Sequence, residues 1–152
     1  MLSELQRLVH DKDLFVLFVG VGNVLRSDDG VGVQICEGIH ETANHVVIRA
    51  EVSIENYIGK INALKPDVIV IIDSVYYGKD PGYAALSPVD SLLDFTTHTH
   101  NISLRKTLEL FHARVWVLGI QPDSVAFGEH LSPAVMKTAR EIIGIINEDE
   151  PT

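Results

Sequence analysis

Apolar residues follow two alternating patterns along this chain. Continuous apolar runs rich in β-branched and aromatic residues predict strands buried on both faces, and apolar residues spaced three or four positions apart predict amphipathic helices. The strands are expected at 14–19, 45–51, 68–72 and 115–118. The helices are expected at 3–10, 30–39, 54–64, 104–110 and 133–147. This alternation predicts a parallel sheet with right-handed crossover connections.

Local sequence signals also predict where the first and last helices begin and where an edge strand lies. Ser3 and Ser132 are expected to cap the first and last helices, with Pro133 at the first helical position. A short strand is expected at 82–87, after a glycine turn, at an edge of the sheet. We therefore predict a single α/β domain over 1–152. Its twisted, mostly parallel sheet is flanked by helices on both faces, with a peripheral helix within 1–12 and a tail at 148–152.

Composition and charge narrow the class of protein. Hydrophobic residues make up 46% of the chain and charged residues 22%, which is the balance of a globular protein. The most apolar stretch is shorter than the roughly 20 residues that a membrane span needs, so no span is expected. A net charge of −9 repels a phosphate backbone, so nucleic acid is not an expected partner. A single cysteine and no secretion signal favour the cytoplasm.

Glycines and two aspartates follow the first expected strand. The segment GVGNVL at 20–25 begins like a dinucleotide-binding fingerprint, but Leu25 stands where the third glycine is needed. Asp28 and Asp29 come next, and carboxylates would repel a bound phosphate. The glycines are therefore expected to form a tight turn that presents the aspartate pair. Helix capping by one aspartate and solvation of the other is the alternative.

Two more polar clusters occur where ligands bind in open α/β sheets, beyond the carboxyl ends of the strands. Asp73 ends an apolar strand, and His98 and His100 lie in a threonine-rich segment. Two carboxylates and an imidazole suit a divalent cation such as nickel or zinc, with one position left for water or substrate. Because these residues are far apart in the sequence, their spacing leaves both the metal site and a turn or cap role for Asp73 open.

Motifs along nearly the whole chain resemble the hydrogenase maturation endopeptidases, which remove the C-terminal extension from the nickel-containing large subunit of hydrogenase. They are GVGNVLRSDDGVG at 20–32, IIDSV at 71–75, HNISL at 100–104, GIQP at 119–122 and LSP at 131–133. The resemblance implies that Asp29, Asp73 and His100 contact the metal. It also implies that the large-subunit precursor is the partner and that nickel arrives with this substrate. Zinc or cadmium is expected to substitute for nickel in crystals.

The expected roles of the residues follow this resemblance. Asp29 and Asp73 are assigned to catalysis, because a cation that they hold would polarise the scissile carbonyl or lower the pKa of a bound water to about 7. Substrate contacts are expected from the loop after the first strand and from the threonine-rich segment, at Gly22, Asn23, Asp28 and His98. Asp28 is also a candidate for the general base.

Two other functions remain open at this point. A phosphoacceptor switch domain also has an acidic pair after its first strand and an aspartate at the end of its third. It needs a lysine after its last strand, however, and the segment 117–122 has none. A non-catalytic nickel-binding chaperone of the same fold is the second alternative. It would bind a nickel-loaded precursor without cleaving it.

Overall fold

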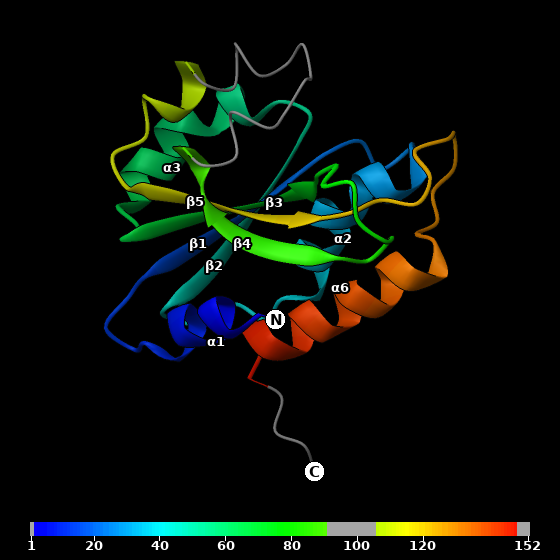
Figure 1. The fold of residues 1–152 in the computed structure, drawn as a ribbon. Helices are drawn as coiled ribbons and strands as arrows, with labels where there is room; N and C mark the ends of the chain where they lie inside the picture. The colour runs from blue at the N-terminus through cyan, green and yellow to red at the C-terminus, as the bar shows by residue number, and fades with distance from the viewer. Residues whose placement is uncertain (1, 91–105, 149–152) are drawn as a thin grey trace.

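The computed structural model describes residues 2–90 and 106–148 (Figure 1). The strands are β1 (Val16–Val21), β2 (His45–Glu51), β3 (Val68–Ser74), β4 (Ala84–Pro88) and β5 (Arg114–Ile120). The α-helices are α1 (Ser3–His10), α2 (Val31–Gly38), α3 (Ile58–Leu64) and α6 (Pro133–Ile146). Two 3₁₀ turns, η1 (Ser27–Gly30) and η2 (Ile54–Tyr57), lead into α2 and α3. The expected strand–helix alternation is confirmed.

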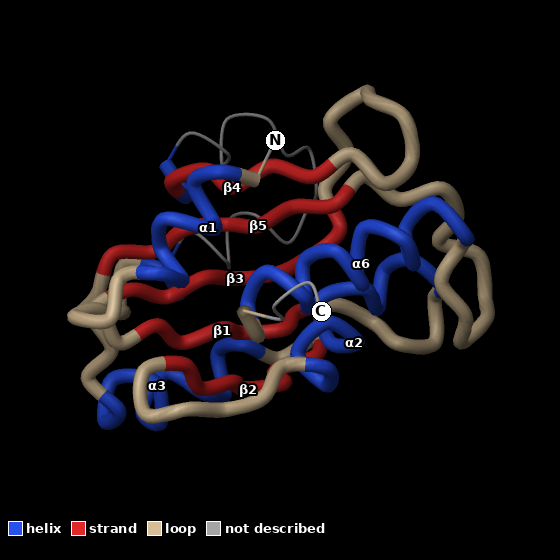
Figure 2. The backbone as a smooth tube through the Cα atoms, turned by 90° about the horizontal axis from the view of Figure 1, so that it is seen from below, coloured by secondary structure: helices blue, strands red, loops and turns tan. Residues whose placement is uncertain are grey.

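The strands form one sheet in the order β2-β1-β3-β5-β4 (Figure 2). The pairs β1–β2, β1–β3 and β3–β5 are parallel, and only β4 runs antiparallel, at the edge beside β5. The expected edge strand is thus confirmed, and its direction is now known. Among residues 2–90 and 106–148, no helix is both long and apolar enough to cross a membrane.

The sheet separates two apolar cores. Along β1, Val16 and Phe18 face the core formed with α1, α2 and α6, and Leu17 and Val19 face the core formed with α3 and residues 108–111. All four side chains are fully buried, as expected for a central strand covered on both faces. Figure 1 shows α6 and α1 on one side of the sheet and α3 on the other. The expected arrangement of helices on both faces is confirmed.

The helices are only partly as expected from the sequence. Leu5 and Val9 of α1 are fully buried in the first core, so one face of this helix contributes to that core while most of its other residues are exposed. The N-cap of α1 is Leu2, without a side-chain capping bond, so the expected Ser3 cap is wrong. Ser132 is the N-cap residue of α6 and Pro133 is its first residue, as expected, although the Ser132 side chain makes no capping bond. The expected 104–110 helix lies partly outside the described residues, which show one helical turn at 106–108.

The connections create a switch point at the centre of the sheet. The chain leaves β1 toward β2 on one side, and it leaves β3 toward β5 and β4 on the other. The loops that follow β1 and β3 therefore diverge, and ligands bind in the crevice between such loops. Gly32 at the start of α2 lies so close to β3 that a Cβ there would overlap the backbone oxygen of Ile72. The loop after β1 and the end of β3 are thus held together.

Candidate active site

Asp29 joins the loop after β1 to the end of β3. One of its carboxylate oxygens, Oδ2, accepts a hydrogen bond from the backbone N–H of Asn23 at 2.9 Å. The other, Oδ1, accepts one from the hydroxyl of Ser74 at 3.0 Å. A carboxylate held through both oxygens has a fixed orientation. Ser74 was not singled out in the sequence, although it directly follows Asp73 in the IIDSV motif.

Asp73 lies beside Asp29 at the end of β3. Its Oδ1 accepts a hydrogen bond from the backbone N–H of Ser74 at 2.7 Å. Burial raises the pKa of Asp73 well above its ordinary value, and the negative charge of Asp29 raises it further, while the Ser74 bond opposes both effects. The two aspartates expected to act together are therefore close enough to repel each other. Such a pair favours the binding of a proton or a cation.

Gly22 makes the close approach of these groups possible. Its φ of +128° is one that residues with a side chain rarely adopt. A Cβ built on it would overlap the backbone oxygen of Asp29 and lie 3.3 Å from Oδ1 of Asp73. Its N–H donates to the backbone oxygen of Glu51 at the end of β2. The position expected to contact substrate thus has a demonstrable role in backbone geometry.

Replacing Gly22 with Ala is expected to disturb both the aspartate pair and the fold. The added methyl group must push Asp29 away, and the alanine must keep a strained φ. Together these changes cost about 1–3 kcal/mol of unfolding free energy. The activity that depends on the aspartate pair should fall at least tenfold, and the midpoint of thermal unfolding should fall with it. The matched control is Gly59→Ala in α3, where a Cβ would meet no atom within 4 Å. A Gly22→Ala protein with wild-type activity would contradict the close approach.

Asp28 lies next to Asp29 in η1 but faces a different part of the molecule. It is fully buried. Its carboxylate accepts four hydrogen bonds, from the backbone N–H groups of Asp123, Ser124 and Ser132 and from the Ser132 hydroxyl. Burial alone would raise its pKa, but these bonds hold the pKa below its ordinary value. The structure therefore gives Asp28 a structural role that does not fit the substrate contact or general base expected from the sequence.

The loop between Asn23 and Asp28 is shaped by its own polar groups. The side-chain oxygen of Asn23 accepts a hydrogen bond from the N–H of Leu25 at 2.9 Å, which is a turn typical of asparagine. A parallel bridge joins Arg26 to Gly128 in the segment that follows β5. Figure 1 shows this segment beside the start of α2. Asn23 thus stabilises the loop that carries Asp29, and its expected contact with substrate stays a prediction.

The remaining expected groups, His98 and His100, lie outside the described residues. Within the described ranges, no three His, Cys, Asp or Glu side chains come together as a metal site. The structure thus brings together the two carboxylates of the expected metal set, and the third ligand stays a prediction. Cys36 is buried, and burial raises the pKa of its thiol to about 12. A nucleophilic thiolate at this position is therefore not supported.

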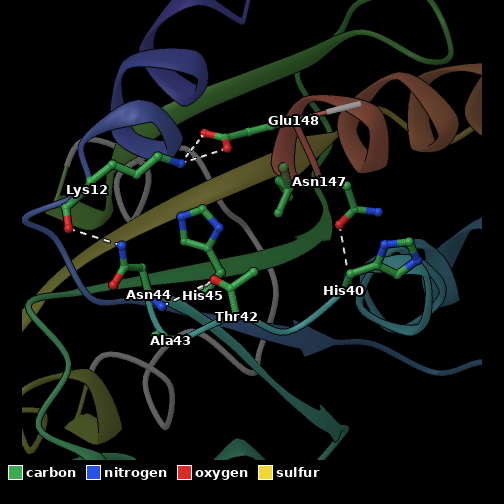
Figure 3. Close-up of a pocket in the computed structure, with 9 residues that line it drawn as sticks. Lys12, His40, Thr42, Ala43, Asn44, His45, Asn147 and Glu148 are labelled. Atoms are coloured by element: carbon green, nitrogen blue, oxygen red, sulfur yellow. Dashed lines mark hydrogen bonds and ion pairs between the residues drawn. The ribbon is translucent and has the colours of Figure 1, made fainter. Parts of the chain in front are cut away.

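A separate pocket of about 230 Å³ lies at the opposite end of the strands, around His45 at the start of β2 (Figure 3). An ion pair between Lys12 and Glu148, with oxygen and nitrogen 2.7 Å apart, closes one side. His45 is buried, and its Nε2 has no hydrogen-bond partner. Burial and the nearby Lys12 charge lower its pKa. This pocket contains neither carboxylate of the candidate site.

Comparison with known proteins decides the family. A sequence model of the hydrogenase maturation proteases, of the HycI type, matches residues 32–149. The chain belongs to the hydrogenase maturation protease family. It is therefore a peptidase, as expected from the sequence, and the phosphoacceptor alternative is wrong.

Individual relatives of this maturation protease agree in sequence and in fold. The hydrogenase 3 maturation protease of Escherichia coli is 34% identical over 113 residues, which cover 70% of this chain and 72% of the relative. The crystal structure of the [NiFe] hydrogenase maturation protease HycI from Thermococcus kodakarensis superposes with a TM-score of 0.80 at 26% identity. That superposition covers 96% of this chain and 97% of the other. The expected α/β fold is confirmed.

Proposed function

We propose that this maturation protease removes the C-terminal extension from the large-subunit precursor of a nickel-containing hydrogenase, and that nickel seated in the precursor marks the correct substrate. The observation that carries the proposal is the carboxylate pair Asp29 and Asp73 at the switch point of the sheet. Family membership supports the peptidase reaction. The single free thiol, Cys36, fits a reducing compartment, and we infer that the protein works in the cytoplasm.

The chemistry of the pair fits a divalent cation. Two adjacent carboxylates, one of them with a raised pKa, are electrostatically unfavourable until a positive charge lies between them. Oxygen donors from Asp29 and Asp73, with an imidazole from His100, would form a site with at least one open position. A cation in such a site polarises a carbonyl oxygen or lowers the pKa of a bound water.

The pair also gives a physical reason for a dependence on nickel. In the free enzyme, the raised pKa of Asp73 favours its protonated form. A nickel-bearing precursor placed next to the pair would offset the burial and the repulsion that disfavour the ionised form of Asp73, so binding of the loaded substrate favours two ionised carboxylates. An ionised carboxylate can then accept a proton from the attacking water. As the peptide C–N bond breaks, the proton passes to the departing amine nitrogen.

The bonds that hold Asp29 are expected to keep this geometry ready for substrate. Its two oxygens are engaged by Asn23 and Ser74, so the side chain does not need to find its rotamer when substrate arrives. Holding a catalytic group in the productive orientation lowers the barrier by removing an entropic cost. Asn23 and Ser74 are thus positioning residues.

The deciding experiment compares nickel-loaded and nickel-free precursor, incubated with the same enzyme preparation and analysed by mass spectrometry of the C-terminus. Loss of the extension only from the loaded precursor is the expected result. Equal rates on both would refute nickel recognition and leave a peptidase that needs no substrate-borne metal. Tight binding of loaded precursor without cleavage would instead support the chaperone alternative. Asp29→Asn serves as the inactive control.

A further inference from the structure

Exposed apolar side chains are concentrated at the edge of the sheet that carries the carboxylate pair. Six large apolar side chains are exposed within 2–90 and 106–148, and four of them follow the four parallel strands, one after each. We call these four the apolar rim: Leu25 after β1, Val52 after β2, Tyr76 after β3 and Phe127 after β5. The other two, Leu64 and Leu110, lie at the end of α3 and before β5. The apolar rim is therefore on the same edge of the sheet as Asp29 and Asp73.

Phe127 is the most exposed member, at 86% of its maximum, although its backbone is fixed. On one side of it, the backbone oxygen of Ala126 accepts a hydrogen bond from the Ser27 hydroxyl at 2.7 Å. On the other, Gly128 accepts from the Ser27 N–H at 2.7 Å and donates to the Leu25 oxygen at 2.9 Å. An aromatic ring exposed to this degree adds little to folding stability. A rigid aromatic side chain does, however, bind a partner at low entropic cost.

The apolar rim and the carboxylate pair share the same loops. Leu25 lies four residues before Asp29, and Tyr76 lies three residues after Asp73. The Phe127 loop is tied to the Asp29 loop through the buried carboxylate of Asp28, which accepts hydrogen bonds from Asp123 and Ser124. A protein that covers the rim is thus placed over the pair with little freedom to shift.

We infer that the apolar rim is the surface on which the folded part of the precursor docks, with Phe127 as its main contact. This inference rests on the proposed function, because it assigns the rim to the same substrate. A second copy of the chain is a less suitable occupant, since each copy carries a net charge of −9 and the two repel each other. A second copy on the rim would also cover the pair. Docking there explains how one peptide bond of a whole protein is brought to the site.

The test measures steady-state cleavage of nickel-loaded precursor by wild type, Phe127→Ser and Leu110→Ser. Leu110 is the matched control, because it is 54% exposed but lies away from the rim. Phe127→Ser is expected to raise KM about tenfold, as for a central interface residue, with the loss in KM rather than kcat. Leu110→Ser should keep the wild-type KM, and both variants should keep the wild-type midpoint of thermal unfolding. Leu25→Ser is a second rim variant, expected to raise KM less.

The outcomes separate this inference from the proposed function. If wild type cleaves and Phe127→Ser keeps its KM, docking on the rim is refuted and the proposed function stands. If wild type binds the precursor without cleaving it, the proposed function fails. A tenfold weaker affinity of Phe127→Ser would then still support the rim. If sedimentation shows a wild-type dimer that Phe127→Ser dissociates, the rim is an interface between copies, and the inference is wrong.

Discussion

Asp73→Asn is expected to abolish cleavage while leaving the fold at least as stable as wild type. Removing a charged member of a catalytic pair typically costs about 10³-fold or more in rate. The asparagine keeps the shape and an oxygen that can accept the N–H of Ser74. It removes a carboxylate that is desolvated and repelled by Asp29. Activity should therefore fall without a loss of stability, as is common at functional sites.

The pKa of Asp73 determines how the stability of Asp73→Asn compares with that of wild type at each pH. The folded-state pKa of Asp73 is raised, so folding favours its protonated form. The resulting penalty is absent below the unfolded pKa of 3.8 and grows as the pH rises toward the folded-state value. The Asp73→Asn variant carries no such penalty, because its amide does not ionise. Its unfolding midpoint, measured without added metal, should equal that of wild type in acid and match or exceed it at neutral pH.

Asp29→Asn is the companion variant. It removes the other charge of the pair and should lose activity to a similar degree. Because its charge contributes to the raised pKa of Asp73, its removal should also weaken the pH-dependent penalty. A protein in which either substitution lowers stability but retains cleavage would show that the pair supports the fold and not the reaction.

Much of the fold follows from local sequence signals. Strand β2 spans the predicted residues, because its apolar run has clear ends, and β4 lies at the predicted edge. The 3₁₀ turns before α2 and α3 were not predicted, since apolar spacing does not distinguish a tight first turn from an α-helical one. The burial of α1 was missed for another reason. Its Leu5 and Val9 look the same in sequence whether the helix lies on the surface or in the core.

The candidate site, like the fold, could be predicted from the sequence only in part. The meeting of Asp29 and Asp73 could be expected from topology, because β1 and β3 are neighbours with their carboxyl ends at one edge. The different roles of Asp28 and Asp29 could not be expected from topology. Both are aspartates in one short turn, and what separates them is a partner segment around Ser124 and Ser132, about a hundred residues later. Only the folded chain shows which carboxylate is buried.

This difference leads to the largest expected effect on stability, in Asp28→Asn. The carboxylate of Asp28 uses both oxygens as acceptors, from the Ser132 N–H on one and from two N–H groups and a hydroxyl on the other. Asparagine offers one oxygen and one NH₂ group, so at least one buried N–H is left facing another donor. Unpaired buried groups of this kind cost about 1–3 kcal/mol each, and more when a charge-assisted bond is lost.

We expect Asp28→Asn to lose about 2–4 kcal/mol of unfolding free energy, or about 5–15 °C in the unfolding midpoint at this chain length. The folded-state pKa of Asp28 is lowered, so its contribution is present above the unfolded pKa of 3.8 and is lost as the pH falls through the folded-state value. The difference between variant and wild type should therefore shrink in strong acid. Chemical denaturation across this pH range, with Asp29→Asn as the matched control, measures it. Equal stability of the two variants at neutral pH would mean that Asp28 does not anchor the segment that carries Phe127.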